Sequence, residues 1–279
     1  MGNSTPLVTV MIASYNHAEY VGDAIKSIMH QTYKNIELIV IDDGSQDNSV
    51  KIIQKLAKKY KFKFISRSNK GLPATLNEGS SLSKGKYFCC CGSDDMYLKD
   101  KIEKQVNFME SNPQFALVYG DIIQFDGKGY EQKTKTKNAV TGWVFDDMVF
   151  GRLNLPAITV MQRTEILKDL GGFDENLWAE DVDLWIRIAN QYKVAYLDEY
   201  LVYYRQHETN ISKNIFRMYQ SQKIILDKWK HKDNYNQFMA VNKLFWFDIL
   251  SRKHKKEAKK YIIPSLKYMF TMTYLKAII

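Results

Sequence analysis

Four short, largely apolar segments mark the first hundred positions of the chain, and a turn follows each of them. They are Leu7–Ala13, Ile36–Ile41, Phe62–Ile65 and Tyr87–Cys91. Mostly apolar runs of this length are typical of parallel strands that are covered on both faces. Between the runs, apolar residues recur at helical spacing, as in Leu72–Leu82. Strands that alternate with helices over short connections predict an α/β fold, a mostly parallel sheet flanked by helices.

The pattern changes in the second half. Phe115–Phe125 and Ile158–Arg163 are predicted strands, and a loop rich in Lys, Thr and Gly lies between them at residues 126–141. Glu180–Tyr192 is a predicted helix, because its apolar residues follow a helical period. The chain from Asn214 onward has a helical pattern throughout. We therefore expect a helical appendage after the α/β part.

These patterns predict two regions that differ in charge. We expect an α/β domain over residues 1–212, whose first part ends at residue 112, and a helical region over residues 213–279. Residues 215–279 hold 14 Lys and Arg against 4 Asp and Glu, whereas the rest of the chain holds 26 against 27. A nucleic-acid-binding protein would carry a basic surface on its folded domain. We therefore expect no nucleic acid partner.

The basic region suits a different partner. Lys253–Lys260 is rich in cations, and the segment after it mixes apolar residues with Lys267 and Lys276. Such a segment can lie on an anionic membrane surface, with its cations toward the lipid head groups and its apolar residues inward. The alternative is a helical appendage that packs on the domain or on a second subunit.

Cysteine usage and the N-terminus indicate the compartment. Cys89, Cys90 and Cys91 are consecutive, which fits neither a zinc site nor a disulfide framework and favours a reducing environment. The first residues show no signal peptide pattern, and no uncharged apolar stretch reaches the roughly 18 residues of a membrane span. We expect a cytoplasmic protein, peripheral on the cytoplasmic face of the inner membrane.

Polar residues follow the predicted strands where a ligand would bind. In an open α/β sheet, ligands bind beyond the carboxyl ends of the strands, and Tyr15, Asp43 and Asp94 all fall there. Tyr15 can stack on a base, and Asp43 can accept a hydrogen bond from a base N–H. The chain has neither a Gly-x-Gly-x-x-Gly nor a Gly-Lys-Ser/Thr loop, which argues against dinucleotide and P-loop sites.

Two pairs of acidic residues carry the candidate chemistry. Asp94 and Asp95 follow the fourth predicted strand, and their oxygen ligands suit Mg²⁺ or Mn²⁺ rather than zinc. Glu180 and Asp181 open the predicted helix, where one carboxylate can act as a general base. The alternative is that both merely place favourable negative charge at the N-terminus of a helix.

Six motifs occur in an order that resembles one enzyme family. They are Ser14-Tyr15-Asn16, Asp42-Asp43-Gly44-Ser45, the run Gly71–Gly79, Gly171-Gly172-Phe173-Asp174-Glu175, the run Glu180–Arg187, and Tyr204-Arg205-Gln206-His207. Together they resemble the inverting, nucleotide-sugar-dependent glycosyltransferases of family 2, of the bacterial surface polysaccharide or O-antigen type. The resemblance covers roughly residues 6–212 and implies the GT-A fold, a Rossmann-like sheet.

The resemblance implies a donor site in residues 1–112. Asp43 would contact the uracil of a UDP-sugar, Asp94 the ribose, and Lys70 a phosphate. The full set of implied donor-binding residues is Ala13, Tyr15, Asp43, Lys70, Asn77 and Asp94.

The resemblance also implies a metal and a base. Most members carry Asp-x-Asp-Asp after the fourth strand, and here Gly92 replaces the first Asp. Asp95 would hold Mn²⁺ or Mg²⁺, and His207 would complete the metal shell unless its role is structural. No other histidine, that is His17, His30, His231 or His254, shows clustering in the sequence, so these receive no role.

The acceptor side would lie in residues 113–212. Asp181 is the implied base, and Trp178 and Glu180 are the implied acceptor-binding residues. The implied reaction moves a hexose from a UDP-sugar, with inversion, to a lipid-linked or oligosaccharide acceptor. Two alternatives remain: a nucleotidyltransferase, whose Gly-rich loop is missing here, and a non-catalytic carbohydrate-binding or scaffold protein, which Gly92 keeps open.

Overall fold

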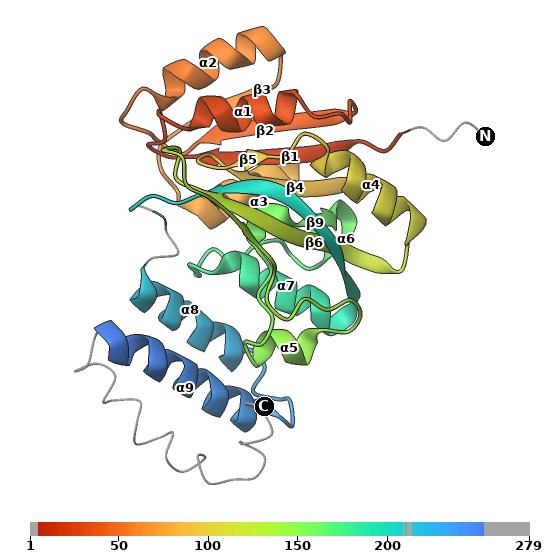
Figure 1. Cartoon of the computed structure of the whole chain (residues 1–279), viewed down its shortest axis with the longest axis vertical. Helices are drawn as coiled ribbons and strands as arrows, with labels where there is room; N and C mark the ends of the chain where they lie inside the picture. Colours follow the sequence, from red (N-terminus) through yellow and green to blue (C-terminus); the bar gives the residue numbers. More distant parts are fainter. Residues whose placement is uncertain (1–4, 209, 211–213, 254–279) are drawn as a thin grey trace.

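The structure, a computed structural model, describes residues 5–208, 210 and 214–253. Within this part of the chain, nine strands form one sheet, and helices cover both of its faces (Figure 1). The strand order is β3-β2-β1-β4-β8-β6-β9-β5, and β7 pairs with β6 outside this path. The expected α/β architecture is confirmed.

The first half of the sheet is parallel. It consists of β1 (Val8–Ser14), β2 (Ile36–Asp42), β3 (Lys63–Ser66) and β4 (Tyr87–Gly92). Strand β1 is central, because it pairs in parallel with both β2 and β4. The structure confirms the four predicted strands. The largely apolar strands β1, β2 and β4 are covered on both faces, whereas β3 lies at the edge of the sheet and is only partly buried.

The sheet separates the apolar core into two clusters, and different helices cover each of them. Helices α1 (Val21–Met29), α2 (Ser49–Tyr60) and α4 (Lys101–Ser111) contribute to one cluster. Helix α3 (Leu72–Leu82) contributes to the other, on the opposite face of the sheet. Alternate residues of β1 face alternate sides, so Val10 and Ile12 enter the first cluster and Met11 the second.

The second half of the sheet is mixed. Strand β6 (Phe115–Phe125) pairs in parallel with β9 (Lys193–Arg205), and β8 (Met161–Arg163) lies antiparallel between β4 and β6. The remaining strands are β5 (Met96–Tyr97) and β7 (Glu131–Thr134), the latter inside the predicted loop. Antiparallel β8 therefore joins the four parallel strands of the first half to the parallel pair β6 and β9.

The predicted strand over Ile158–Arg163 is only partly correct. Its first residues belong to a 3₁₀ turn, η1 (Ala157–Thr159), and only the last three form β8. The Thr159 hydroxyl donates to the carbonyl of Pro156 at 2.7 Å, and this local bond stabilises the turn.

Five helices remain in the part of the chain that the structure describes. They are α5 (Phe145–Val149), α6 (Thr164–Asp169), α7 (Glu180–Gln191), α8 (Ile215–Asp227) and α9 (Tyr235–Lys253). In Figure 1, α6 lies beside β6 and β9, whereas the other four lie below the sheet. Ile225, Leu226, Trp229 and Phe238 belong to the same apolar cluster as the α7 core residues. Packing is therefore continuous across residue 212, and the domain division expected there stays a prediction.

The membrane-binding segment expected after Lys253 lies outside the described residues. No helix in the described part of the chain combines the length and the apolar character that crossing a bilayer requires.

Neighbouring isoleucines on α8 test whether this helix belongs to the core. Ile225 is fully buried, whereas Ile224 is 47% exposed. We expect Ile225→Ala to lower the free energy of unfolding by about 2–5 kcal/mol, because it leaves a cavity. The matched change Ile224→Ala should cost less than about 1 kcal/mol. Denaturant unfolding of both variants measures the difference, and equal losses would show that α8 is a loosely attached appendage.

Candidate active site

A cleft of about 520 Å³ opens between the carboxyl end of β4 and the N-terminus of α7. Its walls include Ala13 and Asp95 on the donor side and Trp178, Glu180 and Asp181 on the other side. Residues more than 80 positions apart in the sequence therefore share one cavity. Five of the predicted site residues lie in its wall.

The Asp43 carboxylate organises the loop after β3. It accepts hydrogen bonds from the backbone N–H groups of Lys70 at 2.8 Å and Gly71 at 2.9 Å, and it forms an ion pair with Arg67. The Lys70 side chain is exposed, and so is the ring of Tyr15. This arrangement leaves a ring and a cation accessible at the end of the sheet where a nucleotide is expected. The contacts of Asp43, Tyr15 and Lys70 with a nucleotide stay predictions.

Gly92 stands where the family motif has its first Asp, directly beside the two remaining carboxylates. A Cβ atom at this position would lie 2.7 Å from Asp94 Oδ1 and 2.7 Å from Asp95 Oδ2. Any other residue at position 92 would therefore require these two carboxylates to move from the positions that they occupy here.

The end of β9 fixes this acidic turn. The backbone N–H of Arg205 donates to Asp95 Oδ1 at 2.7 Å, and the Arg205 side chain donates to the carbonyl of Asp94 at 2.8 Å. Asp95 is only 5% exposed, and burial raises its pKa well above the ordinary carboxyl value. Its assignment as a metal ligand stays a prediction.

Asp94 lies at the centre of a second group that could hold a metal ion. Ligand atoms of His17, Asp94 and His207 all lie within 4.8 Å of one another. His207 Nε2 is 2.8 Å from Asp94 Oδ2, and His17 Nδ1 is 2.7 Å from Ser93 Oγ. Burial lowers the pKa of His17, which favours the neutral imidazole that metals bind.

The sequence-based view of His17 as an unclustered histidine is wrong. His17 is 77 positions from Asp94 in the chain, but β1 and β4 are parallel neighbours and end at the same edge of the sheet. The signal was therefore present: His17 follows β1 by three residues, as Asp94 and Asp95 follow β4.

Glu180 and Asp181 begin helix α7. Apolar residues on one face of the helix, among them Leu184 and Trp185, are buried and hold its N-terminus against the cleft. Burial, with a contribution from the negative charge of Asp181, raises the pKa of Glu180 to about 8. Burial also raises the pKa of Asp181, whose Oδ1 accepts from the N–H of Val182 at 2.7 Å.

These pKa directions bear on the alternative that the two carboxylates only balance the helix dipole. A carboxylate in that role is exposed, and its pKa falls. Glu180 is 5% exposed, and its pKa rises, so the desolvation effect outweighs the helix dipole. Paired carboxylates with raised pKa values in a cleft are characteristic of proton-transfer sites.

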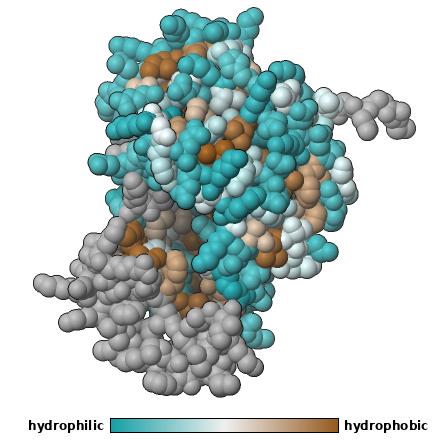
Figure 2. All heavy atoms as spheres, viewed as in Figure 1, coloured by the Kyte–Doolittle hydropathy of each residue, from teal (hydrophilic) through white to brown (hydrophobic). Residues whose placement is uncertain are grey.

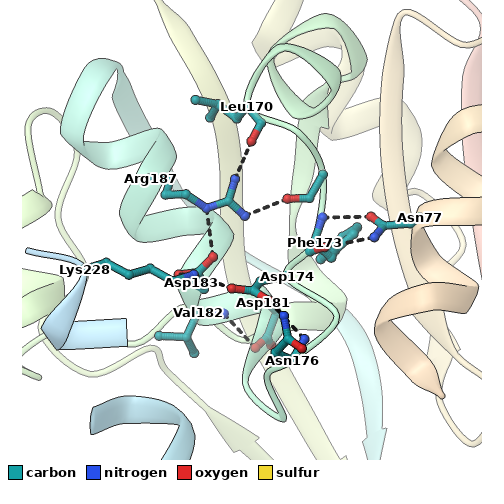
Figure 3. Close-up of polar contacts among 11 residues, drawn as sticks. Asn77, Leu170, Phe173, Asp174, Asn176, Asp181, Val182, Asp183, Arg187 and Lys228 are labelled. Carbon is teal, nitrogen blue, oxygen red and sulfur yellow. Dashed lines mark hydrogen bonds and ion pairs between the residues drawn. The ribbon is translucent and has the colours of Figure 1, made fainter. Parts of the chain in front are cut away.

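A polar network holds the loop that precedes α7 (Figure 3). The Asn77 side chain accepts from the N–H of Phe173 at 2.8 Å and donates to its carbonyl at 2.9 Å. Arg187 donates to the carbonyls of Leu170 and Gly172. Asn77 therefore positions this loop, and its expected contact with the donor stays a prediction.

Lys228, just after α8, completes the network. Its Nζ is 2.6 Å from Asp174 and 2.7 Å from Asp183, and Arg187 also pairs with Asp183 at 2.8 Å. Asp183 is almost fully buried, and both cations balance its negative charge. Because Asp183 lies two residues after Asp181, this ion-pair cluster fixes the start of the helix that carries the candidate base.

Trp178 lies at the rim of the cleft and is 46% exposed. The Arg217 guanidinium lies 3.8 Å from the centre of the Trp178 ring. The backbone N–H of Trp178 donates to Ser221 Oγ at 2.8 Å. Helix α8 therefore forms part of the wall where an acceptor is expected. The acceptor contacts of Trp178 and Glu180 stay predictions.

Sequence comparison identifies the family. The family described as "Glycosyl transferase family 2" matches residues 9–165, more than half of the chain. The chain belongs to glycosyl transferase family 2. This confirms the family that the motifs indicated, and it shows that the protein is a glycosyltransferase.

Two curated relatives of this family 2 chain are described as uncharacterized glycosyltransferases. One from Rickettsia typhi is 32% identical over 225 residues, which is 78% of this chain and 70% of the relative. One from Methanocaldococcus jannaschii is 28% identical over 252 residues, which is 88% of this chain and 87% of the relative. Three other rickettsial relatives are longer, and the chain spans only 31 to 36% of their length.

Solved structures confirm the GT-A fold of the family 2 enzyme. Staphylococcus aureus TarS 1–349 in complex with UDP-GlcNAc aligns with a TM-score of 0.73 at 20% identity, covering 93% of this chain and 79% of that one. The mannosyltransferase PcManGT from Pyrobaculum calidifontis, in complex with GDP-Man and Mn²⁺, has a TM-score of 0.62 at 13% identity, covering 98% and 83%.

The raised pKa of Glu180 predicts a pH-dependent stability. The pKa of Glu180 is about 8 in the folded state, whereas an unperturbed Glu side chain has a pKa of 4.5. The folded state therefore holds the carboxyl proton of Glu180 more tightly than the unfolded state. The stabilisation from the protonated Glu180 carboxyl is complete below pH 4.5 and is lost as the pH rises through about 8. Between these values, the free energy of unfolding should fall by a few kcal/mol relative to Glu180→Gln.

Denaturant unfolding between pH 5 and 8 measures this slope. Glu165→Gln, on the exposed side of α6, is the control. Parallel curves for the wild type and Glu180→Gln would show that the Glu180 carboxyl is already ionised at low pH.

Proposed function

We propose that this family 2 enzyme transfers a hexose from a UDP-sugar to a hydroxyl of a glycan acceptor, with inversion at the anomeric carbon. The observation that carries the proposal is the single cleft whose walls hold Asp95 on one side and Glu180 and Asp181 on the other. A similar fold, TarS, has been solved with UDP and with UDP-GlcNAc, which supports a uridine nucleotide as the donor carrier.

Asp181 is proposed as the general base. The acceptor oxygen forms a bond to the anomeric carbon while the bond from that carbon to the diphosphate breaks on the opposite face. The proton of the acceptor hydroxyl passes to the Asp181 carboxylate, a role worth about 10²–10⁴ in rate. Attack from the face opposite to the leaving group inverts the configuration, so an α-linked donor gives a β-linkage.

The donor set at the acidic turn fits a divalent cation. Asp95 and His207 are the expected ligands, and the structure adds Asp94 and His17 as candidates. Carboxylate oxygens suit both Mg²⁺ and Mn²⁺. When bound, the ion would neutralise charge on the diphosphate leaving group. PcManGT, solved with Mn²⁺, supports this assignment.

The acceptor is proposed to be a lipid-linked oligosaccharide of a bacterial surface polysaccharide, on the cytoplasmic face of the inner membrane. The Trp178 ring at the rim of the cleft packs against Arg217 but is still 46% exposed, and we propose that its exposed part contacts a sugar. The basic C-terminal region is proposed to hold the enzyme on anionic lipid.

Removing the carboxylate of Asp181 tests the base. Asp181→Asn should lower turnover by about 10²-fold or more and leave the dissociation constant of the UDP-sugar within about twofold, because the base acts only in the transition state. Initial rates and titration calorimetry measure the two quantities. Asp233→Asn, at an exposed position, is the control. Wild-type turnover in Asp181→Asn would remove this residue from the mechanism.

Four substitutions compare the candidate metal ligands. In Asp94→Asn, Asp95→Asn, His17→Gln and His207→Gln, loss of a ligand should raise the Mn²⁺ concentration for half-maximal activity roughly tenfold or more. His30→Gln, an exposed histidine, should have no effect. Full activity of the wild type in chelator would overturn the metal role of all four residues.

Vesicle sedimentation tests the membrane proposal. The full chain should sediment with anionic vesicles but not with neutral ones, and added salt should weaken this binding by screening. A chain that ends at Lys253 should lose most of the binding. Unchanged binding would show that the segment after Lys253 does not contact lipid.

A further inference from the structure

The inner end of the catalytic cleft is largely apolar. Phe88, Leu155, Val160 and Trp185 line it, and all four are nearly or fully buried. Phe88 lies on β4, the strand that ends at the acidic turn, so this inner end is continuous with the donor side of the site. Trp178, where an acceptor is expected, is by contrast 46% exposed.

One polar side chain interrupts this apolar wall. Gln162 lines the cleft, is only 3% exposed, and its Oε1 has no hydrogen-bond partner among the described residues. Its backbone is held in the sheet on both sides, opposite Phe88 and opposite Leu117, so the side chain is fixed to this face. Of the buried unpaired polar atoms in the described part of the chain, this is the one in the cleft wall.

An unpaired buried carbonyl oxygen is costly, so the group that fills the cleft should supply its partner. The last torsion of a glutamine side chain is soft, and rotation presents either the oxygen or the NH₂ group to the cleft. The carboxamide can then accept one hydrogen bond and donate another to the same ligand.

The chemistry of the wall selects among three possible occupants. A hydrocarbon chain would satisfy the apolar residues but leave the Gln162 carboxamide unpaired. An unsubstituted hexose would pair with Gln162 but place further hydroxyl groups against Phe88, Leu155 and Val160. An acetamido group satisfies both requirements, because its N–H and carbonyl match the carboxamide and its methyl group matches the apolar residues.

We propose that the inner end of the cleft is an acetamido pocket, so that the transferred sugar is an N-acetylhexosamine, read by Gln162. The proposal rests on the proposed function and names the donor class for the same site. The donor rather than the acceptor is assigned to this pocket, because the pocket lies along β4 beneath the acidic turn and away from the exposed rim.

Two matched pairs of donors test the proposal with the full chain and Mn²⁺. UDP-N-acetylglucosamine is compared with UDP-glucose, and UDP-N-acetylgalactosamine with UDP-galactose, by titration calorimetry and by release of UDP. In at least one pair, the acetamido sugar should bind about tenfold or more tightly than its parent hexose. Equal affinity within both pairs would overturn the acetamido pocket while leaving the proposed transferase intact.

Variants assign the preference to the residue. Gln162→Met keeps the length of the side chain and removes its amide, so the preference should fall to within about threefold while the affinity for UDP alone is unchanged. Gln162→Leu is the second variant, and Gln114→Met, at an exposed glutamine, should keep the full preference. An acetamido preference that survives both Gln162 variants would overturn the role of this residue. Failure of the wild type to bind any UDP-sugar would instead overturn the proposed function, and the pocket with it.

Discussion

The geometry of the candidate active site depends on one long-range contact, between the end of β9 and the acidic turn after β4. Arg205 donates from its backbone to Asp95 and from its side chain to the carbonyl of Asp94, across 110 positions of the chain. This contact ties the second half of the fold to the first, and it brings His207 beside Asp94. The Arg205 guanidinium also lies 4.6 Å from the centre of the Tyr20 ring and 4.4 Å from that of Phe125, which restricts the side chain further.

The cleft is built so that buried acidic groups persist without basic partners. Glu180 and Asp181 face the apolar interior of the cavity, and no ion pair within the described residues involves either of them. The nearby cations, Lys228 and Arg187, pair instead with Asp183, two residues after Asp181 on the same helix. Charge compensation in the supporting layer keeps α7 in place and leaves the raised pKa values of the two carboxyl groups at its start intact.

The parallel half of the fold could be predicted from the sequence, because strands covered on both faces are largely apolar over their whole length. Strand β9 could not be predicted in this way, since Lys193–Arg205 mixes Tyr and charged residues with its apolar positions. It is a strand because it fills the space between β6 and β5. Tertiary pairing decides such segments, and local pattern does not.

The candidate site divides in the same way. Asp181 and Asp95 could be named because they lie in recognisable motifs, and the cleft contains both. Gln162 could not be named, and His17, although it follows β1 closely, is identified only once the structure places it beside Asp94. His17 joins Asp94 through the shared edge of parallel strands, and Gln162 is significant only because its oxygen is buried without a donor. Properties of this kind are visible only once segments far apart in the chain are placed together.

The Lys228 bridge has a consequence for how chimaeric enzymes are built from this family. Helix α8 lines the rim of the cleft, so exchanging the C-terminal region between homologues is an attractive way to change acceptor choice. A splice placed directly after β9 would separate Lys228 from Asp174 and Asp183, the two acids that it holds together. A junction beyond Trp229 keeps this cluster within one parent and transfers only the helix that follows.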